Sequence, residues 1–250
     1  IIRNTAASLQ GERAAAININ VNALNHHFVA DYGRSTGFLD RVVGFTGNQG
    51  PLLRGNQLDD NDLNGLVVRG ATLTTQSVWD DTDIPHIVFE EIVVPDFHSF
   101  GGLRLESSPT ESLVIRLQNQ DPDGLDEMVP DYAGFTATGQ PLDIDDRIGG
   151  SVQVVGQPGH PVIMTSIVDC DASAGFKPNG QPQNEALRDG CLSVGQTGVP
   201  GVWRSIKLDR FSHDRNVDVI TEREKPTISA PGTNAEPSTA QFLGALATGE

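Results

Sequence analysis

Short runs of alternating apolar and polar residues recur along most of the chain, and glycine, proline, asparagine or aspartate separates them. Alternate side chains of a β-strand face opposite sides of the sheet, so such runs predict strands with one buried face. The alternation is clear at Leu103 and Leu105, and again at Val152 and Val154. The predicted strands are 83–94, 101–107, 112–119, 150–156, 160–167, 203–211 and 216–222.

The stretch 55–70, GNQLDDNDLNGLVVRG, shows how closely the interruptions can follow one another. Glycine, asparagine and aspartate are weak helix formers. A single hairpin would have longer alternating strands on both sides of one turn. The stretch therefore predicts one turn of a coil of very short strands, with bends at Asn56, Asp60–Asn61 and Asn64–Gly65. Asparagine and aspartate suit such corners because they tolerate left-handed backbone and bond to their own backbone.

Two segments, 1–24 and 51–73, have the same order of parts and suggest an internal repeat. Each contains two adjacent apolar residues followed by arginine near its start, then a polar region, then alternating aliphatic residues. The alternating residues are Ile17, Ile19 and Val21 in the first segment and Leu66 and Val68 in the second. Repeats of this size are typical of chains that stack successive turns.

Two all-β folds agree with this pattern, because no amphipathic helix of ordinary length precedes residue 235. In a parallel β-helix solenoid, turns of about 20–25 residues stack at about 4.8 Å without crossover helices. An antiparallel β-sandwich would instead join its strands by tight Asn-Gly or Asp-Gly hairpins. Three of the four such dipeptides, at 123–124, 179–180 and 189–190, lie in long polar stretches. The solenoid is therefore the favoured prediction, and the sandwich is the alternative.

The predicted domains are a parallel β-helix over residues 1–222 and a linker with the start of a following module over 223–250. Pro226, Pro231 and Pro237 alternate with small polar residues in the second region, as in linkers. Because the chain begins within a predicted strand and shows no leader peptide, we expect it to be a piece of a longer protein with adjacent domains.

Three segments interrupt the predicted turns and are expected to project from the coil as loops. They are residues 25–50, 119–139 and 170–191. Loops that a rigid scaffold holds in place are where binding specificity usually lies.

The overall charge of the chain narrows the choice of partners. The 250 residues carry a formal net charge of −16. Like charges repel, so nucleic acid and anionic membranes are not expected partners, whereas cations are. No run approaches the ~18 apolar residues that a membrane-spanning helix needs, so no membrane insertion is predicted.

Two cysteines, Cys170 and Cys191, bracket the third loop. Cysteines that close a long irregular loop predict a disulfide, which restricts the unfolded loop by about 3 kcal/mol. A disulfide implies an oxidising compartment. Two free buried thiols are the alternative. The spacing of a zinc site is absent.

Three runs together resemble a known kind of segment. They are 61–108, 134–166 and 201–217. They resemble right-handed parallel β-helix segments, pectate-lyase-like solenoids, of very large secreted multidomain surface proteins of environmental bacteria. The resemblance covers residues 1–222, and the tail from Pro237 resembles the opening of a pre-peptidase β-sandwich module. It implies the fold and an extracellular or cell-surface location. It leaves activity open, since some β-helix proteins are pectate lyases or polygalacturonases and many others are adhesins or passive stalks.

An aspartate-rich run, WDDTD at 79–83, is the best catalytic candidate. Two carboxylates at one strand edge can divide the acid and base roles of glycoside hydrolysis. Trp79 could stack on a sugar ring, and Arg104 or Arg69 could stabilise the anion that forms in a lyase reaction. The candidate catalytic residues are thus Asp80, Asp81, Asp83 and Arg104. Two other interpretations of the same aspartates are a cation-binding site and an ordinary turn.

Other aspartates offer oxygen ligands of the kind that Ca²⁺ prefers. Carboxylates at alternate positions occur at Asp143 and Asp145 and within 58–62, and Asp169 and Asp171 face Asp189 from the other end of the cysteine loop. No run completes an EF-hand, because the glutamate at the twelfth position is missing. Calcium is the only cofactor that the sequence suggests.

The sequence lacks the common motifs for nucleophilic, metalloprotease, phosphate-binding or dinucleotide-binding sites. The histidines are scattered and expected mostly in loops or on the surface; they are His26, His27, His86, His98, His160 and His213. The favoured function is a non-catalytic structural or adhesive solenoid segment of a secreted cell-surface protein that binds a polysaccharide, a surface glycan or calcium. The alternative is a polysaccharide lyase or glycoside hydrolase. The enzyme hypothesis requires the aspartates to line a groove that also contains an arginine and an aromatic side chain.

Overall fold

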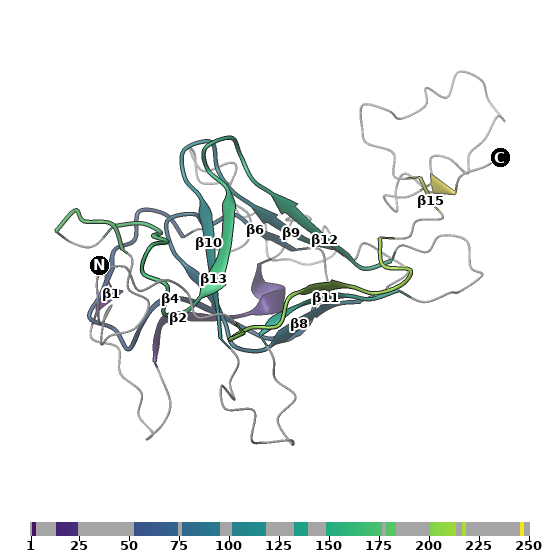
Figure 1. The fold of residues 1–250 in the computed structure, drawn as a ribbon, viewed down its shortest axis with the longest axis horizontal. Helices are drawn as coiled ribbons and strands as arrows, with labels where there is room; N and C mark the ends of the chain where they lie inside the picture. The colour runs from purple at the N-terminus through teal and green to yellow at the C-terminus, as the bar shows by residue number, and fades with distance from the viewer. Residues whose placement is uncertain are drawn as a thin grey trace, which may run out of the picture.

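Strands make up nearly all of the regular structure in the part of this protein that the structure describes (Figure 1). The computed structural model describes residues 2–3, 14–24, 53–74, 77–95, 102–118, 133–139, 149–176, 179–183, 201–213, 217–218 and 246–247. Over these residues the one helix is a single 3₁₀ turn, η1 (Val21–Ala23). None of the described segments is a helix with the length and hydrophobicity needed to cross a membrane.

Three parallel sheets contain most of the strands. The first sheet consists of β2 (Ala15–Asn20), β4 (Leu63–Arg69), β7 (His86–Val88), β10 (Leu113–Leu117) and β13 (Val162–Ser166). The second consists of β5 (Ala71–Thr72), β8 (Glu91–Val94), β11 (Gly134–Ala137) and β14 (Ile206–Leu208). The third consists of β6 (Ser77–Trp79), β9 (Gly102–Glu106) and β12 (Ser151–Val155).

The chain visits the three sheets in a fixed order. The strands β4, β5 and β6 belong to the first, second and third sheets, and β7–β9 and β10–β12 repeat this sequence. We call each set of three a pass; β13 and β14 begin a further one. Each strand pairs in parallel with its counterpart in the next pass. This topology is compatible with a parallel β-helix and differs from the antiparallel sandwich that was the alternative.

Two further pairs lie outside the three sheets. The strands β1 (Ile2–Arg3) and β3 (Leu58–Asp59) pair in parallel. The strands β15 (Val217–Asp218) and β16 (Leu246–Ala247) form the one antiparallel strand pair within the described ranges. One strand of this pair lies before the predicted domain boundary at residue 222 and the other lies after it. The pairing does not locate a boundary, so the boundary at 222 stays a prediction.

The register of the first sheet aligns one interior column of side chains across five strands. Its members are Ile17, Leu66, His86, Ile115 and Met164. The pairings Ile17–Leu66 and Ile19–Val68 confirm the alignment of aliphatic residues expected from the repeat. The core lies between the three sheets, where alternate residues of each strand meet.

Several local predictions were wrong. The predicted strand 83–94 is two strands of different sheets, β7 and β8, separated at residues 89–90. The predicted projecting loop 119–139 contains β11, which pairs with β8 and β14. The pair Asn64–Gly65 lies inside β4, where the register with β2 shifts, so it is a strand irregularity rather than a bend. The bend at Asp60 is confirmed, since this residue has a φ of 51°.

A segment after β13 covers the outer face of the first sheet. We call residues 167–176 and 179–183 the strap. Ile167 packs with the outward-facing Leu63, Val67 and Ile87. Further along, Ala172 and Ala174 pack with Val114 and Ile163. The described part of the predicted loop 170–191 therefore lies against the sheet instead of projecting.

Polar contacts anchor the strap at both ends. The outward-facing Arg116 of β10 is 1% exposed and donates to the carbonyl oxygens of Ile167 at 3.2 Å, Asp169 at 2.5 Å and Ala172 at 2.5 Å. At the other end, Gln183 accepts from the Leu58 backbone N–H at 3.3 Å. The strap thus crosses the first sheet from β13 back to the level of β3.

The strap also carries one of the two cysteines. Cys170 is not a free thiol in the structure. Cys191 lies outside the described residues, so the Cys170–Cys191 disulfide stays a prediction.

Candidate functional site

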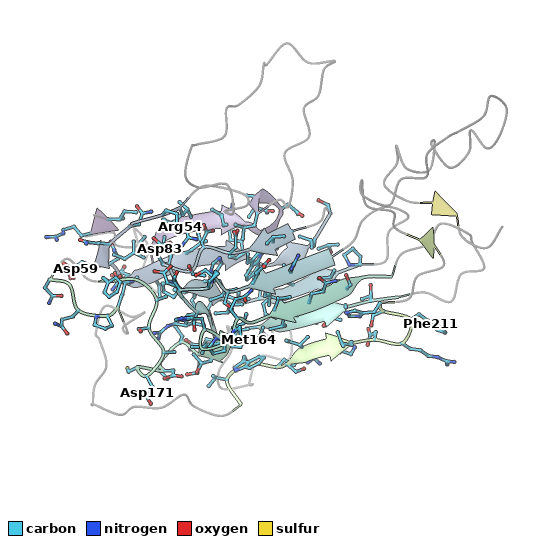
Figure 2. The ribbon with its side chains drawn as sticks, turned by 90° about the horizontal axis from the view of Figure 1, so that it is seen from above. Arg54, Asp59, Asp83, Met164, Asp171 and Phe211 are labelled. Carbon is cyan, nitrogen blue, oxygen red and sulfur yellow. The ribbon has the colours of Figure 1, made fainter. Side chains whose placement is uncertain are left out.

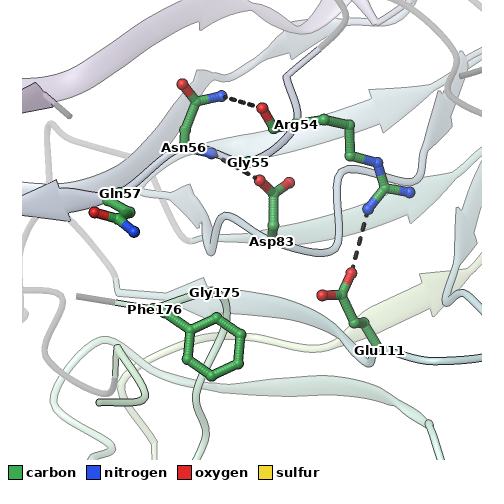
Figure 3. A pocket seen from close by; sticks show the side chains of 8 residues that line it. All are labelled: Arg54, Gly55, Asn56, Gln57, Asp83, Glu111, Gly175 and Phe176. Carbon is green, nitrogen blue, oxygen red and sulfur yellow. Dashed lines mark hydrogen bonds and ion pairs between the residues drawn. The ribbon is translucent and has the colours of Figure 1, made fainter. Parts of the chain in front are cut away.

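A hollow opens between the strap and the turns that enter the first sheet (Figure 3). Its volume is about 340 Å³. We call it the Asp83 hollow; it is lined by Arg54, Gly55, Asn56, Gln57, Asp83, Glu111, Gly175 and Phe176. In the side-chain view, Arg54 and Asp83 lie close together on the side of the molecule where the strands of the first sheet begin (Figure 2).

Three successive turns supply the polar wall of this hollow. Arg54 precedes β3, Thr82 precedes β7 and Glu111 precedes β10, so stacking of the passes brings them together. The Arg54 guanidinium Nη1 donates to Thr82 Oγ1 at 2.9 Å and to Glu111 Oε2 at 3.2 Å. The Thr82 hydroxyl in turn donates to the same Glu111 oxygen at 2.7 Å. The carboxylate of Glu111 therefore has a fixed position and a compensating charge.

The carboxyl of Asp83 is in a different environment from that of Glu111. Asp83 is 8% exposed, and its Oδ2 accepts from the Asn56 backbone N–H at 3.2 Å. Its buried Oδ1 has no hydrogen-bond partner among the residues that the structure describes. Burial raises the pKa of Asp83, while the Asn56 bond and the charge of Arg54 lower it by less. The site therefore holds one carboxylate that is already paired and one acceptor oxygen that is not.

The strap supplies the apolar wall. Gly175 has a φ of 67°, which favours glycine, and it lies directly against the Asp83 backbone. The next residue, Phe176, is 53% exposed, and Figure 3 shows its ring across the hollow from Asp83. An exposed aromatic ring next to buried polar groups is typical of ligand sites rather than of packing.

A second hollow adjoins the first, and Glu111, Gly175 and Phe176 line both. Its volume is about 360 Å³. The remaining lining residues come from the turns before β7, β10 and β13, from β13 itself and from the strap; they are Thr82, Thr110, Ser112, His160, Ile163, Asp171, Ala172, Ser173, Ala174 and Pro182. We call it the His160 hollow.

Of the predicted catalytic residues, the structure places only Asp83 in a hollow. Asp80 and Asp81 are buried and line neither hollow. Arg104 lies on β9 in the third sheet, where its Nε is 3.2 Å from Glu106 Oε2. The arginine next to Asp83 is instead Arg54. The enzyme hypothesis requires aspartates that line a groove together with an arginine and an aromatic side chain. Asp83 does line a hollow, with Arg54 as the arginine and Phe176 as the aromatic residue. Catalysis itself stays a prediction.

The suggestion that Trp79 stacks on a sugar is wrong, because this side chain is fully buried. Its ring stacks on the ring of His86, with centroids 5.2 Å apart, and Phe135 meets it edge-on at 5.7 Å. His86 is also fully buried, unlike the loop or surface position expected for most of the histidines. Burial lowers the pKa of His86 to about 3, with a smaller opposing effect of the Ile84 backbone. His86 is thus a neutral core residue.

The candidate calcium ligands are only partly described. Asp169 accepts hydrogen bonds at both carboxylate oxygens, from the hydroxyl of Thr165 and from the Asp171 backbone N–H. Within the described ranges, no group of three acidic, histidine or cysteine side chains is placed to hold a metal. Asp143, Asp145 and Asp189 lie outside the described residues. Calcium binding therefore stays a prediction.

Sequence reasoning missed four residues of the site: Arg54, Thr82, Glu111 and Phe176. Phe176 had a detectable signal, since it is an aromatic residue among the turn-forming residues of a polar loop. The other three lie in separate turns, and nothing local indicates that these turns meet.

No protein-family model, curated protein or solved structure matches this chain. The resemblance to β-helix segments of bacterial surface proteins accordingly depends on the residue patterns and on the topology of the three parallel sheets.

Proposed function

We propose that the three sheets form a right-handed parallel β-helix, and that this segment is a structural and adhesive module that binds a glycan in the Asp83 hollow. The repeated order of the three sheets and the parallel register across successive passes support the solenoid. The resemblance supports an extracellular or cell-surface location, and the acidic surface is typical of a soluble, non-nucleic-acid-binding module.

The observation that carries the glycan proposal is the exposed ring of Phe176, which lies across the hollow from Asp83 and near the fixed Arg54–Glu111 pair. A sugar has hydroxyl donors at its edge and apolar C–H groups on its faces. The hydroxyls exchange hydrogen bonds with polar groups that line the hollow, and the C–H face packs on the aromatic ring. Arg54 and Glu111 add a donor and an acceptor at fixed positions.

A glycan array followed by calorimetric titration tests this proposal on the whole chain. Binding of at least one glycan is expected, and Phe176→Ala and Asp83→Asn should each weaken it about tenfold or more. Leu208→Ala is the matched control for the aromatic change, because Leu208 is 57% exposed and lines neither hollow. Asp209→Asn, at a surface ion pair with Lys207, is the control for the charge change.

Equal loss of affinity in the control variants would show that the effect is not local to the hollow. Failure of every glycan to bind to a folded chain would reject the proposed function.

A glycoside hydrolase is the second candidate, and the unlike environments of Asp83 and Glu111 favour it over a lyase. A carboxyl whose pKa is raised suits a general acid, and a paired carboxylate suits the ionised partner. The test is release of reducing ends from any glycan that binds. Release that is lost in Asp83→Asn even at glycan concentrations that saturate the variant would establish the enzyme. Binding without release keeps the adhesive function.

A further inference from the structure

We propose that the Asp83 hollow and the His160 hollow are one groove that binds an uncharged oligosaccharide, one with neither acidic nor amino groups, across successive passes of the chain. The inference rests on the proposed glycan-binding function and adds the length and the charge of the ligand. Its basis is the shared wall, since Glu111, Gly175 and Phe176 contribute to both hollows.

The polar side of this groove has four levels, one for each of four turns in successive passes. Arg54, Thr82, Glu111 and His160 precede β3, β7, β10 and β13, respectively. Counterparts in neighbouring passes are spaced by about 4.8 Å, so four levels extend over roughly 14 Å. A groove of this length has room for several linked sugar units, and one unit would fill only a part of it.

The strap closes the opposite side along the same direction. Phe176 lies between the two hollows, so its exposed ring is available to sugars in either one. The isolated bridge between Phe176 and Pro182 holds this part of the strap together. We infer that the oligosaccharide runs along the stacking direction of the passes, with Phe176 near its middle.

The charges of the groove select against charged sugars. Asp83, Glu111 and Asp171 contribute carboxylates, and Arg54 already pairs with Glu111. An acidic oligosaccharide would be repelled, because its carboxylates would approach others at a partly desolvated surface. An amino sugar gains little beside Phe176, because burial disfavours the ionised form of Asp83 and the Glu111 carboxylate already pairs with Arg54. Hydroxyl groups bond to the polar groups of the groove without either cost.

The experiment titrates the whole chain with three oligosaccharide series of increasing length: glucose and mannose oligomers, galacturonic acid oligomers and glucosamine oligomers. The affinity for an uncharged series is expected to rise about tenfold or more from one unit to several and then to level off. The acidic series should bind at least about tenfold more weakly than the uncharged series at low salt, and this difference should shrink at high salt.

Two variants separate the halves of the groove. His160→Ala should weaken the longer oligomers and leave the shortest binding oligomer unchanged, whereas Asp83→Asn should weaken every length. Thr110→Ala, at the edge of the His160 hollow, should follow His160→Ala with a smaller effect.

Each result has a distinct meaning for the two proposals. Affinity that does not rise with length, or His160→Ala binding like the wild type at every length, would overturn the single groove. Tighter binding of the galacturonic acid or glucosamine series would overturn the assignment of charge. In both cases glycan binding itself would stand. If no uncharged series binds but the array yields another glycan, the inference fails and the proposed function survives.

Discussion

Gly175 of the strap lies in direct contact with the backbone of Asp83. A Cβ atom at Gly175 would lie 2.0 Å from the Asp83 carbonyl oxygen and 3.1 Å from its carbonyl carbon. Since real Cβ atoms do not approach backbone so closely, only glycine permits this contact. The same contact brings Phe176 to the hollow, so it links the packing of the strap to the shape of the candidate site.

The first prediction follows from this contact. Gly175→Ala should displace the strap, lower the free energy of unfolding by about 2 kcal/mol or more, and abolish glycan binding. Urea denaturation measures the first effect and calorimetry the second. Gly180→Ala is a matched control, because Gly180 is also in the strap with a φ of 80° but has no atom within 4 Å of its added Cβ. An equal loss of unfolding free energy in both variants would show that the effect comes from backbone strain alone.

The second prediction concerns the arginine beneath the strap. Arg116→Leu should cost about 3 kcal/mol or more of unfolding free energy, because it leaves three strap carbonyl groups without their charged donor. Arg116→Lys should recover only part of this, since an ammonium cannot reproduce the fork of a guanidinium. Urea denaturation gives both values.

Arg3→Leu is the control for loss of an arginine charge. Arg3 is 46% exposed in its surface pair with Asp59, and such pairs contribute less than about 1 kcal/mol. If Arg116→Leu cost no more than Arg3→Leu, the strap would not depend on this anchor.

The third prediction is a loss of stability in acid that originates at His86. Its pKa is lowered to about 3 in the folded chain, against 6.5 for the unfolded side chain. The unfolded state therefore binds a proton first as the pH falls below about 6.5, and the folded state is destabilised progressively until about pH 3. A shift of this size corresponds to about 5 kcal/mol at most. Chemical denaturation at a series of pH values measures it.

His86→Leu should remove this pH dependence, because leucine continues the aliphatic column of Leu66 and Ile115. Asp83 acts in the opposite direction: its raised pKa favours the folded state as the pH falls. Asp83 is present in both proteins, so its contribution cancels when the unfolding free energy of His86→Leu is subtracted from that of the wild type at each pH. An unchanged pH profile in the variant would show that His86 is not the group responsible.

The fourth prediction concerns calcium at the start of the strap. Both oxygens of Asp169 accept protein hydrogen bonds, so Asp169→Asn should lower the melting temperature by the same amount with calcium and with EDTA. Differential scanning calorimetry measures the shift under the two conditions. A loss seen only in the presence of calcium would instead place the ion at Asp169 and Asp171.

The sequence by itself determined several of the strands and part of their register. Alternation along a strand depends only on which side chains are apolar, so the positions of β9, β10, β12 and β13 could be predicted. The match of Ile17 with Leu66 followed from the same property. The turn at Asp60 was also local, because its backbone conformation depends on the residue type.

Only the tertiary structure decided which sheet each strand joins and what covers the outer faces. The run 83–94 is continuous in apolar character, so its division between two sheets could not be detected locally. Apart from Ile167, the buried apolar residues of the strap are the small Ala172 and Ala174, so no alternating apolar pattern marked it as a packed segment. Arg54, Asp83, Glu111 and Phe176 come together because three distant turns stack in one register and the strap folds back over them. Such contacts depend on long-range packing, which a local pattern of side chains does not specify.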